Sequence, residues 1–182
     1  MAGRPELKAT VLPVSCFGKA DGKIVIDLAG YSFGKFQIAV MDSSSKQLVG
    51  FDNGVKMPYE VKNLKGGSYT VLYSWENKTE KHEVKINSPE ILKANIITIK
   101  ELKGEGTSIS ATLQANPSGG NLPYSIIWSD NTGKQTGNTA KDLPLGIYRC
   151  TIDDSNHCGP VTPTFFLYED EIKKYQEKIK HN

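Results

Sequence analysis

The chain lacks the long apolar runs that mark membrane helices and secretory signals. None of its 182 residues belongs to an apolar stretch near the roughly 18 residues that cross a bilayer. Residues 1–18 scatter Arg4, Glu6 and Lys8 where a signal would need about 7 to 15 consecutive apolar residues. We therefore expect a soluble chain that is made in the cytoplasm and has no membrane span. A cell-surface setting is the alternative, if the sequence is a fragment of a longer secreted protein.

Strong charge and frequent cysteine are also absent. Lys and Arg total 22 against 20 Asp and Glu, a net charge of +2, which is too small to indicate nucleic acid as a partner. The three cysteines, Cys16, Cys150 and Cys158, allow at most one intramolecular disulfide. Their low number does not indicate a small secreted protein held together by disulfides. Which pair bonds, if any, stays open.

Catalytic and cofactor motifs are missing as well. No histidine has the spacing of a zinc signature, and Gly104-Glu105-Gly106 lacks the further glycine and the strand-helix context of a nucleotide-binding loop. No Ser, His and acid can be assigned to a triad. Cys150, His157 and Cys158 suit zinc by chemistry, but Cys150 lies on the apolar side of an alternating segment, which favours packing. We expect no enzyme activity, no cofactor and no metal.

What the sequence does contain is a series of short alternating segments. Apolar side chains recur at every second position in residues 23–28, 36–40, 69–73, 109–113, 124–128 and 148–152. This period is typical of half-buried strands, and turn residues such as Ala20-Asp21-Gly22 and Lys65-Gly66-Gly67 separate the segments. The pattern predicts an all-β protein built as an antiparallel sandwich or barrel.

The two halves of the chain resemble each other. A shift of 88 residues superposes Phe36 on Tyr124, Ile38 on Ile126 and Val40 on Trp128; a later shift of 79 superposes Asn63 on Asp142, Gly67 on Gly146, Tyr69 on Tyr148 and Val71 on Cys150. The change of shift, 88 − 79, indicates about nine extra residues in the first copy around residues 51–57, where we expect a loop. We predict two tandem β-rich repeats, residues 1–88 and 89–168, with a boundary near Asn87-Ser88-Pro89.

The repeats also predict which side chains form the cores. Trp128 shares the inward side of its segment with two neighbours and is expected to fill the space between two sheets. Two tyrosines that follow a glycine at a strand start are expected to tie a loop to the backbone through their hydroxyls. The predicted core residues are Trp128, Tyr124, Tyr69, Tyr148, Ile38 and Ile126.

Residues 169–182 differ from the rest of the chain. Ile172, Tyr175 and Ile179 stand at positions i, i+3 and i+7, with acidic residues first and lysines later. This arrangement predicts an amphipathic α-helix of about three turns. Because an isolated helix of this length is marginal in water, its apolar stripe is expected to dock on its own domain or on a partner protein, or else the helix frays.

Three groups of residues form recognisable motifs. The first is Val14-Ser15-Cys16-Phe17-Gly18 followed by Asp21-Gly22, the second is Gly119-Gly120-Asn121-Leu122-Pro123-Tyr124-Ser125-Ile126-Ile127-Trp128, and the third comprises residues 143–148 and 154–158. They resemble the opening, the middle and the close of the SprB-type repeat, a unit of large surface adhesins in gliding bacteria. The first copy lacks the terminal cysteine and the second lacks the opening one. The resemblance implies an immunoglobulin-like sandwich in both copies.

Two functions are compatible with these features. The first is a non-catalytic structural protein that cements or bridges subunits of a large assembly, with a minor capsid protein of a virion as one example. It would bind other proteins through Ile172, Tyr175 and Ile179 and through exposed loops or strand edges. The second is a cell-surface adhesion or ligand-binding module of SprB type, which would use loops such as residues 52–57 or 130–137.

Overall fold

The structure, a computed structural model, describes residues 6–30, 36–53, 57–103 and 110–168. These residues form β-strands and one short 3-10 helix, so the fold is all-β as the alternation predicted. The predicted C-terminal helix, residues 169–182, lies outside the described residues. Among the residues that are described, no helix is long and apolar enough to cross a membrane. The chain divides into two compact units, Met1–Pro89 (unit 1) and Glu90–Asn182 (unit 2); the sequence had placed this boundary at residue 88.

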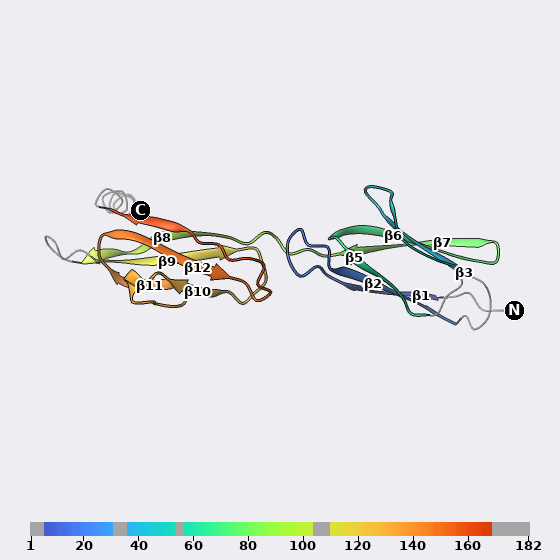
Figure 1. Cartoon of the computed structure of the whole chain (residues 1–182), viewed down its shortest axis with the longest axis horizontal. Coiled ribbons are helices and arrows are strands. Elements are labelled where there is room, and N and C mark those ends of the chain that lie inside the picture. The colour runs from blue at the N-terminus through green and yellow to red at the C-terminus, as the bar shows by residue number, and fades with distance from the viewer. Residues whose placement is uncertain (1–5, 31–35, 54–56, 104–109, 169–182) are drawn as a thin grey trace. The chain divides into compact units, whose positions relative to one another are not determined.

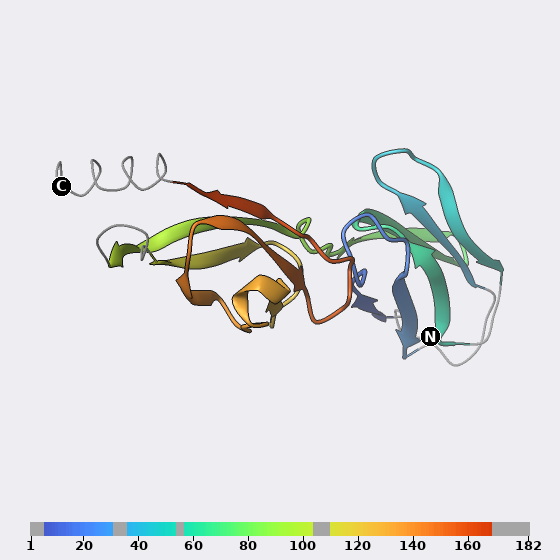
Figure 2. The same cartoon turned by 60° about the vertical axis from the view of Figure 1, so that its left-hand side comes forward.

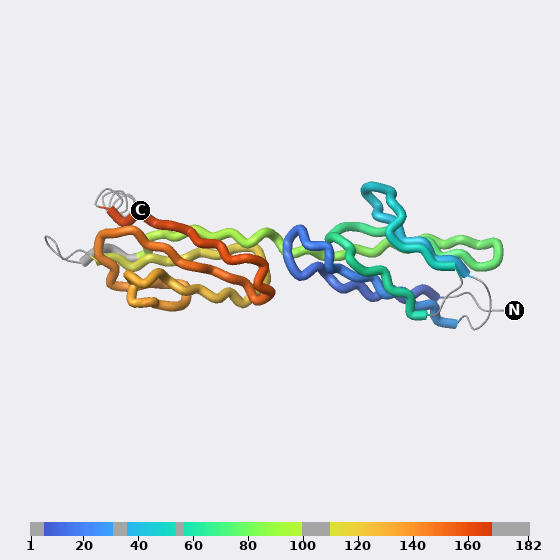
Figure 3. Tube along the Cα trace, viewed as in Figure 1, coloured from blue at the N-terminus to red at the C-terminus, as the bar shows by residue number. Residues whose placement is uncertain are grey.

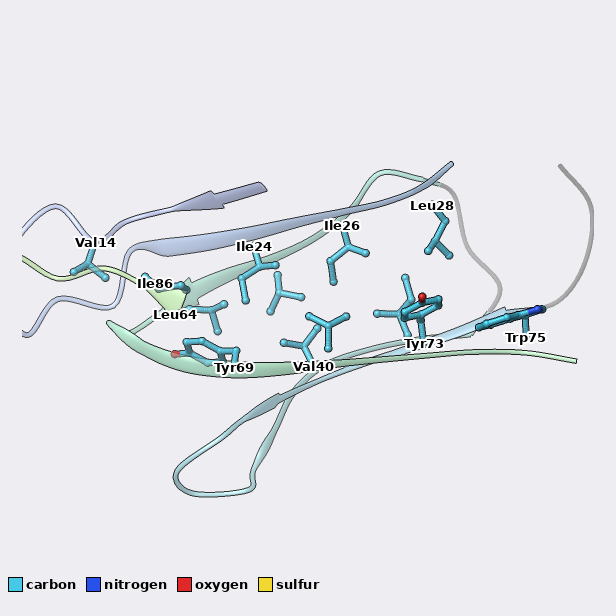
Figure 4. Packing of buried hydrophobic residues seen from close by; sticks show 13 residues of the cluster. Val14, Ile24, Ile26, Leu28, Val40, Leu64, Tyr69, Tyr73, Trp75 and Ile86 are labelled. Atoms are coloured by element: carbon cyan, nitrogen blue, oxygen red, sulfur yellow. The ribbon is translucent and has the colours of Figure 1, made fainter. Parts of the chain in front are cut away.

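Unit 1 contains two antiparallel sheets (Figure 1). The first sheet has the order β1-β2-β5 and consists of β1 (Glu6–Leu12), β2 (Gly22–Ala29) and β5 (Tyr59–Leu64). The second has the order β4-β3-β6-β7 and consists of β4 (Leu48–Asn53), β3 (Phe36–Asp42), β6 (Gly67–Trp75) and β7 (Lys78–Ile86). Both sheets contribute side chains to one core, as the close view of Ile24 and Ile26 from β2, Val40 from β3 and Tyr69 from β6 shows (Figure 4).

Unit 2 repeats this plan with one strand fewer. Its first sheet has the order β11-β9-β8 and consists of β8 (Lys93–Lys103), β9 (Ser110–Ser118) and β11 (Thr139–Leu143). Its second has the order β10-β12-β13 and consists of β10 (Ser125–Trp128), β12 (Gly146–Asp153) and β13 (Thr164–Leu167). Trp128, Tyr148, Leu113 and Ile152 are among the buried residues of its core.

The strand order is that of an immunoglobulin-like sandwich in both units. The first, second and fifth strands of unit 1 form one sheet, and the first, second and fourth strands of unit 2 do the same, because unit 2 has no counterpart of β4. The remaining strands of each unit form its other sheet. Backbone conformations repeat as well. Asn63 and Asp142 have φ of 58° and 55°, and Lys46 and Lys134 have φ of 59° and 57°. Left-handed backbone is uncommon outside glycine, so its recurrence at the superposed positions supports the internal repeat.

The extra residues of the first copy were expected to form a loop, but part of this region is a strand. Leu48–Asn53 forms β4, which extends the second sheet of unit 1 beyond β3. The corresponding part of unit 2 holds the 3-10 helix η1 (Asp130–Thr132) and a single bridge between Ile127 and Thr136. The sequence Leu48-Val49-Gly50-Phe51 includes β-branched and aromatic residues that suit a strand. Because turn residues lie close to this run, the sequence pattern did not indicate a strand here.

Candidate interaction surfaces

The predicted core residues are placed as follows. Trp128 is 1% exposed and its Nε1 donates to the Gly137 carbonyl at 3.0 Å. Ile38, Ile126, Tyr69 and Tyr148 are buried, whereas Tyr124 is half-buried and donates from its hydroxyl to the Gly119 carbonyl at 2.6 Å. These side chains serve packing and loop attachment.

The two superposed tyrosines make the same backbone contact in both units. Tyr69 donates from its hydroxyl to the Lys65 carbonyl at 2.9 Å, and Tyr148 donates to the Pro144 carbonyl at 2.6 Å. Burial raises the pKa of both hydroxyls. Each tyrosine therefore holds the turn that precedes its strand, which is the corner arrangement found in immunoglobulin-like domains.

The motif that closes the second copy is a structural tie. Asp154 is buried, and its carboxylate accepts from the backbone N–H groups of Asn121, Asn156 and Cys158 at 2.8 to 3.1 Å. Burial by itself would raise the pKa of Asp154, but these hydrogen bonds lower it below its usual value. Gly120 has φ of +61°, and a Cβ there would lie 2.8 Å from the Asp154 carboxylate. The middle and closing motifs of the repeat thus fasten two loops together.

The opening motif of the first copy is tied down in the same way. The Asp21 carboxylate accepts from the backbone N–H of Ser15 at 2.9 Å and also from the Ser15 hydroxyl. The hydrogen bonds from Ser15 lower the pKa of Asp21. The residues that carry the SprB resemblance therefore stabilise turns.

The zinc interpretation of Cys150, His157 and Cys158 receives no geometric support. Cys150 is buried with a free thiol, and burial raises its pKa to about 11, so the thiol is protonated at neutral pH. His157 instead pairs through Nδ1 with Asp153 at 2.6 Å, and this hydrogen bond raises its pKa. Within the described part of the chain, no three His, Cys, Asp or Glu side chains are grouped as a metal would need.

The two loops considered for ligand binding are placed as follows. In residues 52–57, Asp52 and Asn53 belong to β4, and residues 54–56 lie outside the described residues. In residues 130–137, the side chain of Gln135 holds the loop, because it donates to the Lys141 carbonyl at 3.0 Å and accepts from the Lys141 N–H at 2.9 Å. Residues 130–137 are therefore a largely exposed turn that Gln135 holds in place.

The edge strand β4 is the surface that sequence reasoning missed in unit 1. Leu48 and Phe51 are 59% and 53% exposed. Phe51 lies opposite Ala39 and Leu48 opposite Met41, with a bulge between them that brings both to the outer side of the sheet. The β3–β4 hairpin projects from the rest of unit 1, as the turned ribbon view and the Cα trace show (Figures 2 and 3).

Gly50 fixes the position of β4. It lies opposite the buried Val40, on the inner side of the strand, and a Cβ there would meet Val61 of β5 at 2.7 Å. Only glycine therefore lets β4 approach β5 so closely. The exposed apolar side chains of β4 are consequently displayed by an ordered strand.

The opposite edge of this sheet is charged. In the sheet that contains β4, the other edge strand is β7. Lys81 and Glu83 of β7 form an ion pair at 2.6 Å. The exposed charged side chains of β7 include Lys78, Lys81, Glu83 and Lys85. Charged edges discourage pairing with other chains. β4 carries no charge before Asp52 and pairs with β3 alone among the described strands. The run Leu48-Val49-Gly50-Phe51 was the sequence signal for this surface.

The predicted partner-binding residues Ile172, Tyr175 and Ile179 lie outside the described residues. Their placement stays a prediction from the sequence.

Comparison with known families gives one match. The sequence model described as the SprB repeat matches residues 9–39, which span most of β1, the opening motif, β2 and the start of β3. The resemblance inferred from the motifs is thereby confirmed for this region. No curated protein sequence matches the chain.

Solved structures of tandem β-sandwich domains resemble the chain at low identity. The full ectodomain (Ig1–Ig3) of mouse nectin-like molecule 4 is 12% identical with a TM-score of 0.42, over 90% of this chain and 62% of that one. Extracellular domains 3–5 of Drosophila OTK are 14% identical with a TM-score of 0.38, over 90% and 61%. A two-domain fibronectin type-III segment of chicken tenascin is 13% identical with a TM-score of 0.37, over 89% and 98%. The chain thus spans less than two thirds of the first two structures.

Proposed function

We propose that the protein is a non-catalytic binding module that joins protein partners, and that β4 of unit 1 is a partner-binding edge. The observation that carries the proposal is the exposed pair Leu48 and Phe51 on an edge strand that has no charged residue before Asp52. Exposed apolar side chains on an ordered strand cost solubility, and such surfaces mark interaction sites in soluble proteins.

The chemistry of β4 indicates the kind of partner. An edge strand offers backbone N–H and C=O groups to another extended segment, and alternate side chains of that segment can contact Leu48 and Phe51. Ala39 and Met41 are half-buried beside them on β3 and extend the apolar surface. A protein segment with apolar side chains at alternate positions is therefore the expected ligand.

Adhesion is the setting that the SprB match favours, since this repeat belongs to surface adhesins. The assembly component is the other setting, and it requires the same protein-binding activity with a different partner. The specific suggestion of a viral minor capsid protein depended on the chain ends, on the lack of a signal sequence and on the C-terminal segment, and neither the described residues nor the comparisons support it.

The test compares capture of partners by three forms of the full chain. We immobilise the wild type, the Leu48→Thr/Phe51→Thr double variant and a Lys81→Thr/Glu83→Thr control. Each form is exposed to surface and soluble fractions of the source cells, and mass spectrometry quantifies the bound proteins. Threonine retains strand propensity, and the control alters the opposite edge of the same sheet. Loss of two interface anchors should reduce capture of a specific partner about tenfold or more in the β4 variant only.

Equal capture by the wild type and the β4 variant would remove β4 from the binding surface. Circular dichroism of each variant verifies that unit 1 is folded before capture is compared. Proteins that bind all three forms equally count as background.

A further inference from the structure

The outer face of β12 and β13 in unit 2 carries a compact apolar surface. Ile147 and Phe166 lie directly opposite each other, and Leu145 and Tyr168 flank the next pair, Gly146 and Leu167. Leu145, Ile147, Phe166 and Tyr168 are 40%, 45%, 51% and 50% exposed. The rings of Phe166 and Tyr168 are 6.1 Å apart. These four residues, here called the β12–β13 face, form two adjacent rows.

Unit 1 has polar or small residues at the same four positions. Its strands β6 and β7 have the same register, with Gly67 opposite Ile86 as Gly146 is opposite Leu167. The residues that replace Leu145, Ile147, Phe166 and Tyr168 are Gly66, Ser68, Lys85 and Asn87, and all four are exposed. The sandwich itself therefore does not require apolar residues at these positions.

The two repeats differ in the segment that comes after these positions along the chain. In unit 1, Asn87 is followed by Ser88-Pro89, and then by the second repeat. In unit 2, Tyr168 is followed by residues 169–182, whose sequence carries the apolar stripe Ile172, Tyr175 and Ile179. The apolar face and the apolar stripe thus occur together in one repeat and are both missing from the other.

We propose that residues 169–182 cover the β12–β13 face of their own unit, with Ile172, Tyr175 and Ile179 packed on Ile147, Phe166 and Tyr168. The sizes agree. On a helix, Ile172 and Ile179 would be about 10 Å apart, and the two rows of the face are separated by about 7 Å along strands that lie about 5 Å apart. The stripe is therefore long enough to cover both rows.

Proximity along the chain favours this occupant over another molecule. The segment begins at Glu169, immediately after a residue of the face, so docking closes a loop of only a few residues. A short connection gives an effective concentration in the millimolar range. A separate partner would have to displace a competitor that is always present.

Photo-crosslinking from the face gives a direct test with the full chain. Phe166 is replaced by p-benzoylphenylalanine, and the cross-linked peptides are mapped by mass spectrometry on an equal mixture of unlabelled and nitrogen-15-labelled protein. We expect cross-links to residues 172–179 within one isotopic species. The matched control places the same photo-reactive residue at Lys85, the equivalent position of unit 1, and should give no cross-link to this segment.

The isotopic pattern decides between the possible occupants. Cross-links that join labelled to unlabelled chains would overturn the assignment in favour of a second copy. A cross-linker at Phe166 that finds no peptide from residues 169–182 would overturn it altogether.

Hydrogen exchange provides an independent measurement. In an Ile172→Ser/Tyr175→Ser/Ile179→Ser variant the amides of β13 should exchange about tenfold faster, because the apolar contacts that cover this edge strand are lost. A Lys174→Ser/Lys178→Ser/Lys180→Ser variant changes the same segment without touching the stripe and should exchange as the wild type does. Equal exchange in the wild type and both variants contradicts the docking.

Discussion

The outer faces of β6–β7 and β12–β13 have the same register and opposite chemistry. Ser68 lies opposite Lys85 in unit 1, whereas Ile147 lies opposite Phe166 in unit 2. Conversely, unit 1 exposes Leu48 and Phe51 on β4, a strand for which unit 2 substitutes a fixed turn. Each repeat thus retains the framework and presents its apolar surface at a different place. The two repeats differ on the outer sides of the sheets, where the fold sets few requirements.

The large side chains also occupy different positions in the cores of the two units. Val40 lies opposite Val71 in unit 1, and the superposed pair in unit 2 is Trp128 opposite Cys150. Unit 1 places its large aromatic rings further along β6, where Tyr73 and Trp75 stack with centroids 5.4 Å apart. A close-packed interior can be filled by different combinations of side chains, so the same strands enclose two distinct sets.

The largest effect is expected from removing the central ring of unit 2. Trp128→Ala should lower the free energy of unfolding of unit 2 by about 3–5 kcal/mol, because it leaves a cavity between the sheets. Calorimetry of the full chain, with hydrogen exchange to assign each transition, measures the change. Ile127→Ala on the same strand serves as the control, since Ile127 is 52% exposed. A loss of less than about 1 kcal/mol in Trp128→Ala would contradict the central role of the ring.

A smaller effect is expected when Cys150 is replaced by valine, the residue that unit 1 has at the superposed position. Cys150→Val replaces a buried group by one of similar volume and should change stability at pH 7 by less than about 1.5 kcal/mol. The pH dependence of the free energy of unfolding should differ more between wild type and Cys150→Val than the stability at pH 7 does. Burial raises the thiol pKa from 9.0 to about 11, so the unfolded chain loses its proton first as the pH rises.

The direction of this pH dependence follows from the linkage between proton binding and folding. The stabilisation from the neutral thiol is fully present below pH 9 and is lost between about pH 9 and pH 11, by on the order of 2 kcal/mol. Denaturant unfolding of wild type and Cys150→Val over this range isolates the contribution, because the other titrating groups are common to both. Parallel pH profiles would show that Cys150 titrates as an exposed thiol.

The smallest effect should be the same in both units. Tyr69→Phe and Tyr148→Phe each remove a hydroxyl that donates to a turn carbonyl, and each should cost about 0.5–1.5 kcal/mol. Equal losses would show that the corner contact belongs to the framework. If only one variant is destabilised, the two corners are not equivalent despite their matching geometry.

The sequence predicted the framework because local patterns encode it. Alternation gave the strands around Ile38, Ile126 and Tyr148, and the superposition of Tyr69 on Tyr148 located two residues with the same backbone contact. The candidate surfaces were less accessible. The sequence places Phe51 in a loop. Nothing in the local sequence indicates that Phe166 faces outward, because a run of consecutive apolar residues does not show which of its side chains are buried.

By itself, therefore, the sequence determined that the protein is all-β, that it repeats, and where glycine and tyrosine fix its turns, because period, backbone conformation and turn chemistry are properties of neighbouring residues. Only the tertiary structure decided which apolar side chains remain exposed, since this depends on pairing between strands far apart in the chain. The register of β3 with β4 and of β12 with β13 turns Leu48, Phe51, Ile147 and Phe166 outward. These are the residues on which both proposals rest.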